Sequence, residues 1–100
     1  MGEKVYSINE IRDIVASVGP KHGVERMFLF GSYARGDARA DSDIDLRIDA
    51  NGITDFFALG GLYADLEEKL GKNLDIVKTK NMSEKFYNYI RGEEIMLYEL

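Results

Sequence analysis

The chain has 100 residues and a formal net charge of -5. That length fits one domain spanning residues 1–100, and hydrophobic residues, at 45%, are enough for a modest core. The acidic balance disfavours direct binding of nucleic acid, whose phosphates attract clustered Lys and Arg side chains. The absence of cysteine excludes thiol catalysis, disulfides and thiolate zinc sites, and the single histidine, His22, excludes a histidine-rich metal site.

No apolar run approaches the ~20 residues that a membrane-spanning helix needs, and residues 1–9 lack the apolar stretch of a signal peptide. We therefore expect no membrane association and a cytoplasmic location. An acidic chain is suited to binding divalent cations or a basic partner surface.

The hydrophobic periodicity and the turn residues predict helices and strands along the whole chain. In chain order these are a helix from Ser7 to Val18, a strand from Val24 to Phe30, a short helix starting at Tyr33, a strand from Asp43 to Asp49, a helix from Asp55 to Leu70, a strand from Asn73 to Lys78, a helix from Ser83 to Arg91 and a strand from Ile95 to Tyr98. Ser7 and Glu10 have the spacing of a capping box. Turns or helix ends are indicated at Gly19-Pro20, Asn51-Gly52 and Gly71.

This order of elements predicts an α/β (α+β) fold, a small mixed sheet backed by helices on one side. In the strand from 43 to 49 aliphatic and charged residues alternate, which places Asp43, Asp45, Arg47 and Asp49 on one face. We expect the open side of the sheet to carry the acidic residues.

The first candidate site element is the Gly31-Ser32 turn, where a buried strand ends and a helix begins. Backbone N–H groups at a helix start attract phosphate, and Gly31 permits a sharp turn and a close approach of the phosphate. The Ser32 hydroxyl can donate to a phosphate oxygen. Arg35 either neutralises a triphosphate or pairs with a nearby acid, and the sequence leaves both open.

The second element is the pair Asp43 and Asp45, two residues apart on a strand. Their Cα atoms would lie ~7 Å apart with both carboxylates on one face. Hard carboxylate oxygens of this kind bind Mg²⁺, and two such ions can assist phosphoryl transfer. Asp75 alternates with Leu74 and Ile76 on another strand, and it joins the same face if the two strands are neighbours. There it would be a metal ligand or a general base.

Several simpler interpretations compete with this one. Asp43 and Asp45 alone could form a solvated strand face, and Asp75 could do the same. An EF-hand loop is excluded because Leu46 stands where glycine is required. A P-loop is excluded because Asp37-Ala38 replaces its Lys and Ser/Thr. The C-terminal aromatic residues are more typical of a core, although a partner interface is also open for Phe86, Tyr87, Tyr89 and Tyr98.

One motif of the chain resembles the signature of the DNA polymerase β-like nucleotidyltransferase superfamily. It consists of Gly31-Ser32, ten intervening residues and then Asp43-Ile44-Asp45. Asp75 resembles its third carboxylate, and the similarity covers nearly the whole chain. The length and the string from Gly31 to Gly36 resemble the minimal nucleotidyltransferase (MNT) domains, including MntA-type antitoxins that act beside a HEPN-domain toxin.

The resemblance implies that Ser32 binds the triphosphate of ATP, that Asp43 and Asp45 hold two Mg²⁺ ions, and that Asp75 activates an acceptor hydroxyl. The implied reaction is transfer of AMP to a tyrosine of a partner HEPN toxin, in a homo- or hetero-oligomer. Two alternatives stay open, a non-catalytic antitoxin that neutralises its partner by occlusion and a small-molecule nucleotidyltransferase of the aminoglycoside type. Additional domains that hold nucleic acid or drug are absent from these residues, which favours a macromolecular acceptor.

Overall fold

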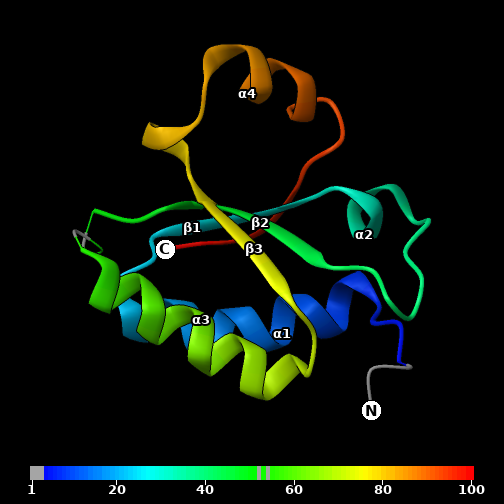
Figure 1. The fold of residues 1–100 in the computed structure, drawn as a ribbon, viewed down its shortest axis with the longest axis horizontal. Helices are drawn as coiled ribbons and strands as arrows, with labels where there is room; N and C mark the ends of the chain where they lie inside the picture. The colour runs from blue at the N-terminus through cyan, green and yellow to red at the C-terminus, as the bar shows by residue number, and fades with distance from the viewer. Residues whose placement is uncertain (1–3, 52, 54) are drawn as a thin grey trace.

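A four-stranded mixed sheet forms the centre of the molecule (Figure 1). The structure, a computed structural model, describes residues 4–51, 53 and 55–100. Its strands are β1 (Arg26–Phe30), β2 (Ile44–Asp49), β3 (Leu74–Lys78) and β4 (Ile95–Glu99), in the order β3-β2-β1-β4. Strand β1 runs antiparallel to β2 and β4, whereas β2 runs parallel to β3. The predicted mixed sheet is confirmed.

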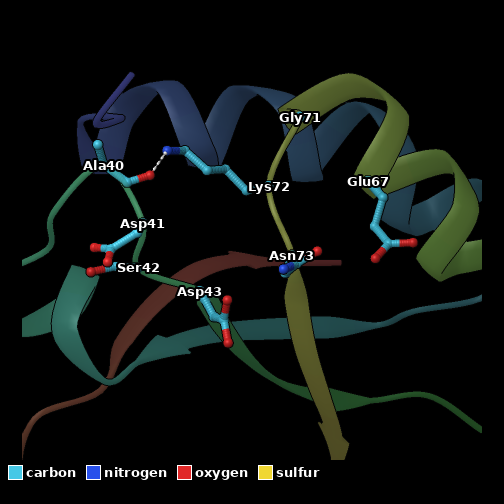
Figure 2. Close-up of a pocket in the computed structure, with 8 residues that line it drawn as sticks. All are labelled: Ala40, Asp41, Ser42, Asp43, Glu67, Gly71, Lys72 and Asn73. Atoms are coloured by element: carbon cyan, nitrogen blue, oxygen red, sulfur yellow. Dashed lines mark hydrogen bonds between the residues drawn. The ribbon is translucent and has the colours of Figure 1, made fainter. Parts of the chain in front are cut away.

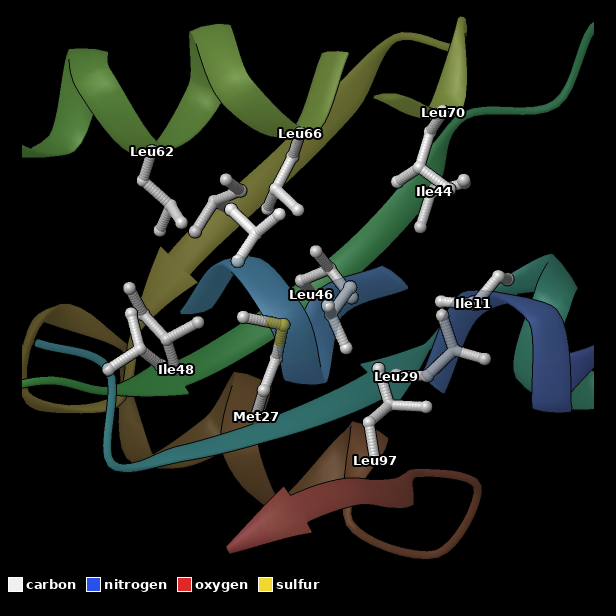
Figure 3. Close-up of a cluster of buried hydrophobic side chains, with 14 of the residues drawn as sticks. Ile11, Met27, Leu29, Ile44, Leu46, Ile48, Leu62, Leu66, Leu70 and Leu97 are labelled. Atoms are coloured by element: carbon white, nitrogen blue, oxygen red, sulfur yellow. The ribbon is translucent and has the colours of Figure 1, made fainter. Parts of the chain in front are cut away.

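Helices α1 (Ile8–Val18) and α3 (Phe56–Leu70) cover one face of this sheet (Figure 1). The core lies between them and the strands, and Figure 3 shows aliphatic side chains from all of these layers meeting there. The fully buried side chains of the strands include Met27, Leu29, Ile44, Leu46 and Ile48. This core fixes the strands whose other face carries the charged residues.

Local sequence signals explain where these helices begin and end. Ser7 and Glu10 form the predicted capping box of α1, and a short 3-10 helix, η1 (Gly19–His22), follows that helix. The Asp55 side chain caps α3 by accepting from the Ala58 backbone N–H. Gly71 ends α3 with a positive φ of 63°, a conformation that glycine adopts without strain.

The prediction that helices cover only one side of the sheet was wrong, because α4 (Glu84–Ile90) lies on the opposite side from α1 and α3 (Figure 1). The 3-10 helix η2 (Thr79–Asn81) leads into α4. The Phe86 ring of α4 meets the Phe30 ring of β1 edge-on, with ring centroids 5.9 Å apart. The second face of the sheet is therefore partly covered rather than open.

Arg47 also departs from the expected solvent-facing position, since only 4% of its side chain is exposed. Its guanidinium lies 3.9 Å from the centre of the Phe28 ring and donates to both carboxylate oxygens of Glu94, at 2.7 and 2.8 Å. The Thr79 hydroxyl accepts a further bond from Arg47. A paired, stacked arginine tolerates this burial because its charge is matched and its donors are used.

The remaining boundaries lie within a few residues of the expected ones. Strand β1 begins at Arg26 rather than Val24, and helix α2 (Ser32–Arg35) begins one residue earlier than expected. Of the predicted Asn51-Gly52 turn, Gly52 lies outside the described residues. Within residues 4–51, 53 and 55–100, none of the helices has the length and apolar character to cross a membrane.

The buried pair predicts a large effect of removing Glu94. Glu94→Ala should lower the free energy of unfolding by about 3 kcal/mol, because it removes the carboxylate paired with the buried Arg47 guanidinium and leaves only the more distant Asp49, at 3.7 Å. Urea denaturation followed by circular dichroism measures this difference. Glu68→Ala, on the exposed surface of α3, is the control and should change the value by less than ~0.5 kcal/mol. Equal effects of the two substitutions would contradict the interpretation.

Candidate active site

The sheet register brings the candidate carboxylates together. Asp45 on β2 pairs directly with Asp75 on β3, so their side chains emerge on the same face of two neighbouring parallel strands. Asp43 immediately precedes β2 and stands two residues before Asp45. The predicted neighbourhood of Asp43, Asp45 and Asp75 is thus present in the structure, although their chemical roles stay predictions.

The three aspartates differ in their surroundings. Asp43 and Asp75 are exposed, whereas Asp45 is partly buried between its strand neighbours. Burial, followed by the charges of Asp75 and Asp43, raises the pKa of Asp45 from 3.8 to about 6. The charged form of Asp45 is thus disfavoured first by burial and then by its acidic neighbours.

The Gly31-Ser32 turn lies directly against Asp45. Phe30, the last residue of β1, pairs with Asp45, and Gly31 then turns the chain with a φ of 77° and a ψ of -154°. A Cβ atom at Gly31 would also collide with the Asp45 carboxylate. Only glycine meets both the backbone and the space requirement here. Ser32 follows as the first residue of α2, partly buried at the same place.

Glu93 joins this turn and was not among the predicted site residues. Its Oε2 atom accepts the Gly31 backbone N–H at 2.7 Å and lies 3.3 Å from Nη1 of Arg35. Arg35 also approaches Asp37, with an Nε–Oδ2 distance of 3.5 Å. The sequence left two interpretations open for Arg35, neutralising a triphosphate or pairing with a nearby acid. In this structure Arg35 pairs with the carboxylates of Asp37 and Glu93. Glu93 is far from Gly31 in the sequence, so no local pattern could identify it.

These elements line one pocket of about 410 Å³. Its polar lining consists of Gly31, Ser32, Arg35, Ser42, Asp43, Asp45 and Glu93. Its other side is apolar and comes mainly from α4, with Phe30, Phe86, Tyr89 and Ile90. A pocket of this size falls in the range of small-molecule sites. The aromatic side was not expected at the site, because the C-terminal aromatics were predicted to belong to the core or to a partner interface.

A second cavity of about 490 Å³ adjoins the first one at Ser42 and Asp43 (Figure 2). Figure 2 shows Lys72 reaching across to the loop before β2, where its Nζ donates to the Ala40 carbonyl oxygen at 2.5 Å. That bond ties the loop to the segment between α3 and β3. It thereby helps to hold Asp43 between the two cavities.

The donor chemistry of the aspartates fits a hard divalent cation, because carboxylate oxygens are its preferred protein ligands. Asp45 and Asp75 pair in the sheet, and after burial the charges of Asp75 and Asp43 contribute to the raised pKa of Asp45. Across residues 4–51, 53 and 55–100, however, three or more Asp, Glu, His or Cys side chains are nowhere gathered into a ready metal cage. An ion here would need additional ligands from water or from a bound phosphate.

Comparison with known protein families and sequences points to one family. The family model for polymerase beta nucleotidyltransferases matches residues 9–100. A chain of Methanocaldococcus jannaschii, provisionally named a protein adenylyltransferase, is 34% identical over 89% of this chain and 96% of its own length. The protein adenylyltransferase MntA of Thermococcus cleftensis is 31% identical over 78% of this chain and 83% of its own.

Solved structures show the same fold. A provisionally named minimal nucleotidyltransferase superposes with a TM-score of 0.77 at 31% identity and covers 90% of this chain and 95% of that chain. The complex of a tri-AMPylated Shewanella oneidensis HEPN toxin with MNT antitoxin matches with a TM-score of 0.72 at 19% identity, over 93% of this chain and 73% of that chain. The chain therefore belongs to the polymerase beta nucleotidyltransferase family and, within it, to the minimal nucleotidyltransferases.

Proposed function

We propose that this domain transfers AMP from ATP, with Mg²⁺, to a tyrosine hydroxyl of a HEPN-domain toxin and so acts as its antitoxin. The observation that carries the proposal is the contact of the Gly31-Ser32 turn with Asp45, which itself stands beside Asp43 and Asp75. The turn proposed to bind phosphate and the carboxylates proposed to bind the cation are thus neighbours at one end of the sheet.

The turn would hold the triphosphate. The Ser32 hydroxyl lies on the polar side of the pocket as a possible donor, and Arg35 adds a positive charge; the Gly31 N–H could also donate once Glu93 leaves it. Glu93 at present accepts from Gly31 and faces Arg35, so a phosphate oxygen would take the place of its carboxylate. Binding of ATP then includes the release of Glu93 from these two partners.

Asp43 and Asp45 are the proposed ligands of two Mg²⁺ ions, with Asp75 as a third carboxylate. Bound Mg²⁺ supplies positive charge that stabilises the phosphate oxygens during transfer. Burial and, after it, the charges of Asp75 and Asp43 raise the pKa of Asp45, and a bound cation would offset both effects. The clustered carboxylates would therefore lower the stability of the protein without a cation and stabilise it once a cation is bound.

Asp75 is exposed beside Asp45 and is the proposed base for the acceptor. Its carboxylate would take the proton of the attacking hydroxyl, whose oxygen forms a bond to the α-phosphorus. The bond from that phosphorus to the oxygen bridging the α- and β-phosphates breaks, and pyrophosphate leaves. The named relatives and the AMPylated toxin in the solved complex support a protein hydroxyl as the acceptor.

Transfer of label from ATP tests the activity. The protein, Mg²⁺, ATP labelled at the α-phosphate and a HEPN-domain protein encoded beside its gene should give an AMP-labelled tyrosine, detected by gel and mass spectrometry. Asp43→Asn and Asp45→Asn should each reduce the rate by a factor on the order of a hundred or more, through loss of charge stabilisation.

Asp13→Asn, on the exposed surface of α1, is the matched control and should keep the full rate. Absence of label transfer by the wild type, or equal transfer by an Asp43→Asn/Asp45→Asn double variant, would contradict the proposal. A double variant that still neutralised the toxin fully would favour neutralisation by occlusion instead.

The raised pKa of Asp45 predicts a pH-dependent stability in the absence of divalent ions. Because the folded chain binds the Asp45 proton more tightly than the unfolded chain does, ionisation of this group lowers stability as pH rises from about 4 to about 6. Asp45→Asn should therefore be more stable than wild type by ~1–2 kcal/mol at pH 8, and the difference should shrink below pH 4.

Urea denaturation in EDTA at several pH values measures this difference. Asp13→Asn should show a difference from wild type that hardly varies with pH over the same range. If Asp45→Asn destabilised the domain at pH 8, the charged Asp45 carboxylate would be stabilising the fold, and it would not be the unfavourable charge that a cation site requires.

The contacts of Glu93 with Gly31 and Arg35 predict that removing its charge will raise the affinity for anions. Glu93→Gln should bind inorganic triphosphate roughly tenfold more tightly than wild type, because the competing carboxylate no longer pairs with Arg35. Isothermal titration calorimetry measures the affinity, with Glu84→Gln on the exposed side of α4 as control. Weaker binding by Glu93→Gln would instead mean that Glu93 holds Arg35 in place for the phosphate.

A further inference from the structure

The pocket beside the aspartates has an aromatic shelf, defined here as the side chains of Phe86 and Tyr89 on α4. Ser83 caps this helix by accepting the Phe86 backbone N–H at 3.1 Å, and the Phe86 ring is held edge-on against Phe30. Tyr89 follows three residues later and so lies on the same side of the helix. Both side chains line the pocket that also contains Ser32 and Asp45.

The shelf remains exposed to solvent although aromatic side chains of this size usually gain by burial. Phe86 is 39% exposed and Tyr89 is 75% exposed, whereas the neighbouring Ile90 is only 2% exposed. Helix α4 therefore buries Ile90 against the sheet and leaves the two rings at the pocket. Their position suits a flat apolar group that enters the same pocket as the phosphates.

We propose that the aromatic shelf is the nucleobase subsite, with the base of the nucleotide stacked on Tyr89 and Phe86. This inference rests on the proposed function, which places the triphosphate at Gly31 and Ser32 on the polar side of the same pocket. Base–aromatic stacking tolerates different bases because every base has a π-face, and it is stronger for the larger purine rings. The shelf thus selects purine over pyrimidine triphosphates and distinguishes little between adenine and guanine.

Comparison of ATP, GTP, CTP and inorganic triphosphate tests the subsite. Their affinities with Mg²⁺ are measured by calorimetry for wild type, Phe86→Ala, Tyr89→Ala and Tyr89→Phe. Tyr89→Ala and Phe86→Ala should weaken ATP and GTP binding roughly tenfold and leave the affinity for inorganic triphosphate unchanged. Tyr89→Phe should bind ATP as wild type does, because the ring and not the hydroxyl makes the contact.

Two control variants come from α3, on the other side of the sheet. Phe56 and Phe57 are 90% and 94% exposed, so Phe56→Ala and Phe57→Ala remove even more exposed rings away from the pocket and should leave ATP affinity unchanged. Tyr89→Ala is the decisive variant because Tyr89 is largely exposed and its loss spares the core. Thermal melts check that Phe86→Ala, which loses the contact with Phe30, is folded at the temperature of the titration.

The outcomes separate this inference from the proposed function. Wild type that binds ATP and triphosphate, with no loss of ATP affinity in Tyr89→Ala and Phe86→Ala, would overturn the subsite and leave the proposed function standing. Parallel losses for ATP and triphosphate would also overturn it, because the rings would then be supporting the phosphate site. Wild type that bound neither ligand would remove the proposed function and the subsite together.

Discussion

The close approach of the Gly31 backbone to the Asp45 carboxylate is the contact on which the site depends. Strand β1 ends at Phe30, opposite Asp45, and only a residue without a Cβ can then turn away at a φ of 77° without striking that carboxylate. Since β2 also pairs with β3 at Asp45 and Asp75, the same register places the third carboxylate. One glycine and one sheet register thus bring together the turn proposed to bind phosphate and the carboxylates proposed to bind the cation.

Packing elsewhere in the fold stabilises the unfavourable grouping of Asp45 with its acidic neighbours. The apolar face of the sheet is buried by α1 and α3, which holds the strands in a register that keeps like charges together. On the other face, Arg47 and Glu94 form a matched pair beside Phe28, and α4 closes one side of the pocket. The burial and the like-charge repulsion that raise the pKa of Asp45 are therefore offset by favourable packing elsewhere, as is common at functional sites.

Local signals allowed most of the elements to be predicted. The Ser7 capping box, the glycine at position 71 and the alternation around Leu46 are determined by neighbouring residues, and they were found as expected. The pairing of Asp45 with Asp75 could be anticipated only conditionally, because it requires β2 and β3 to be adjacent. Residue spacing alone does not distinguish a metal site from a solvated strand face. The resemblance to the family signature favoured the metal site for Asp43 and Asp45.

Other features depend on tertiary structure and could not be derived from local patterns. Alternation predicted a solvent-facing Arg47, because a pattern cannot show that Glu94 and two aromatic rings will surround it. The seven-residue helix α4 is too short for its periodicity to indicate which face of the sheet it covers. Glu93 reaches Gly31 only because the chain between α4 and β4 folds back onto the turn.

The most direct test of the central claim is a crystal structure of the domain with Mg²⁺ and a non-hydrolysable ATP analogue. We expect phosphate density on Gly31 and Ser32 and metal density beside Asp43 and Asp45. A nucleotide bound elsewhere, with neither phosphate on the turn nor metal on the aspartates, would contradict it.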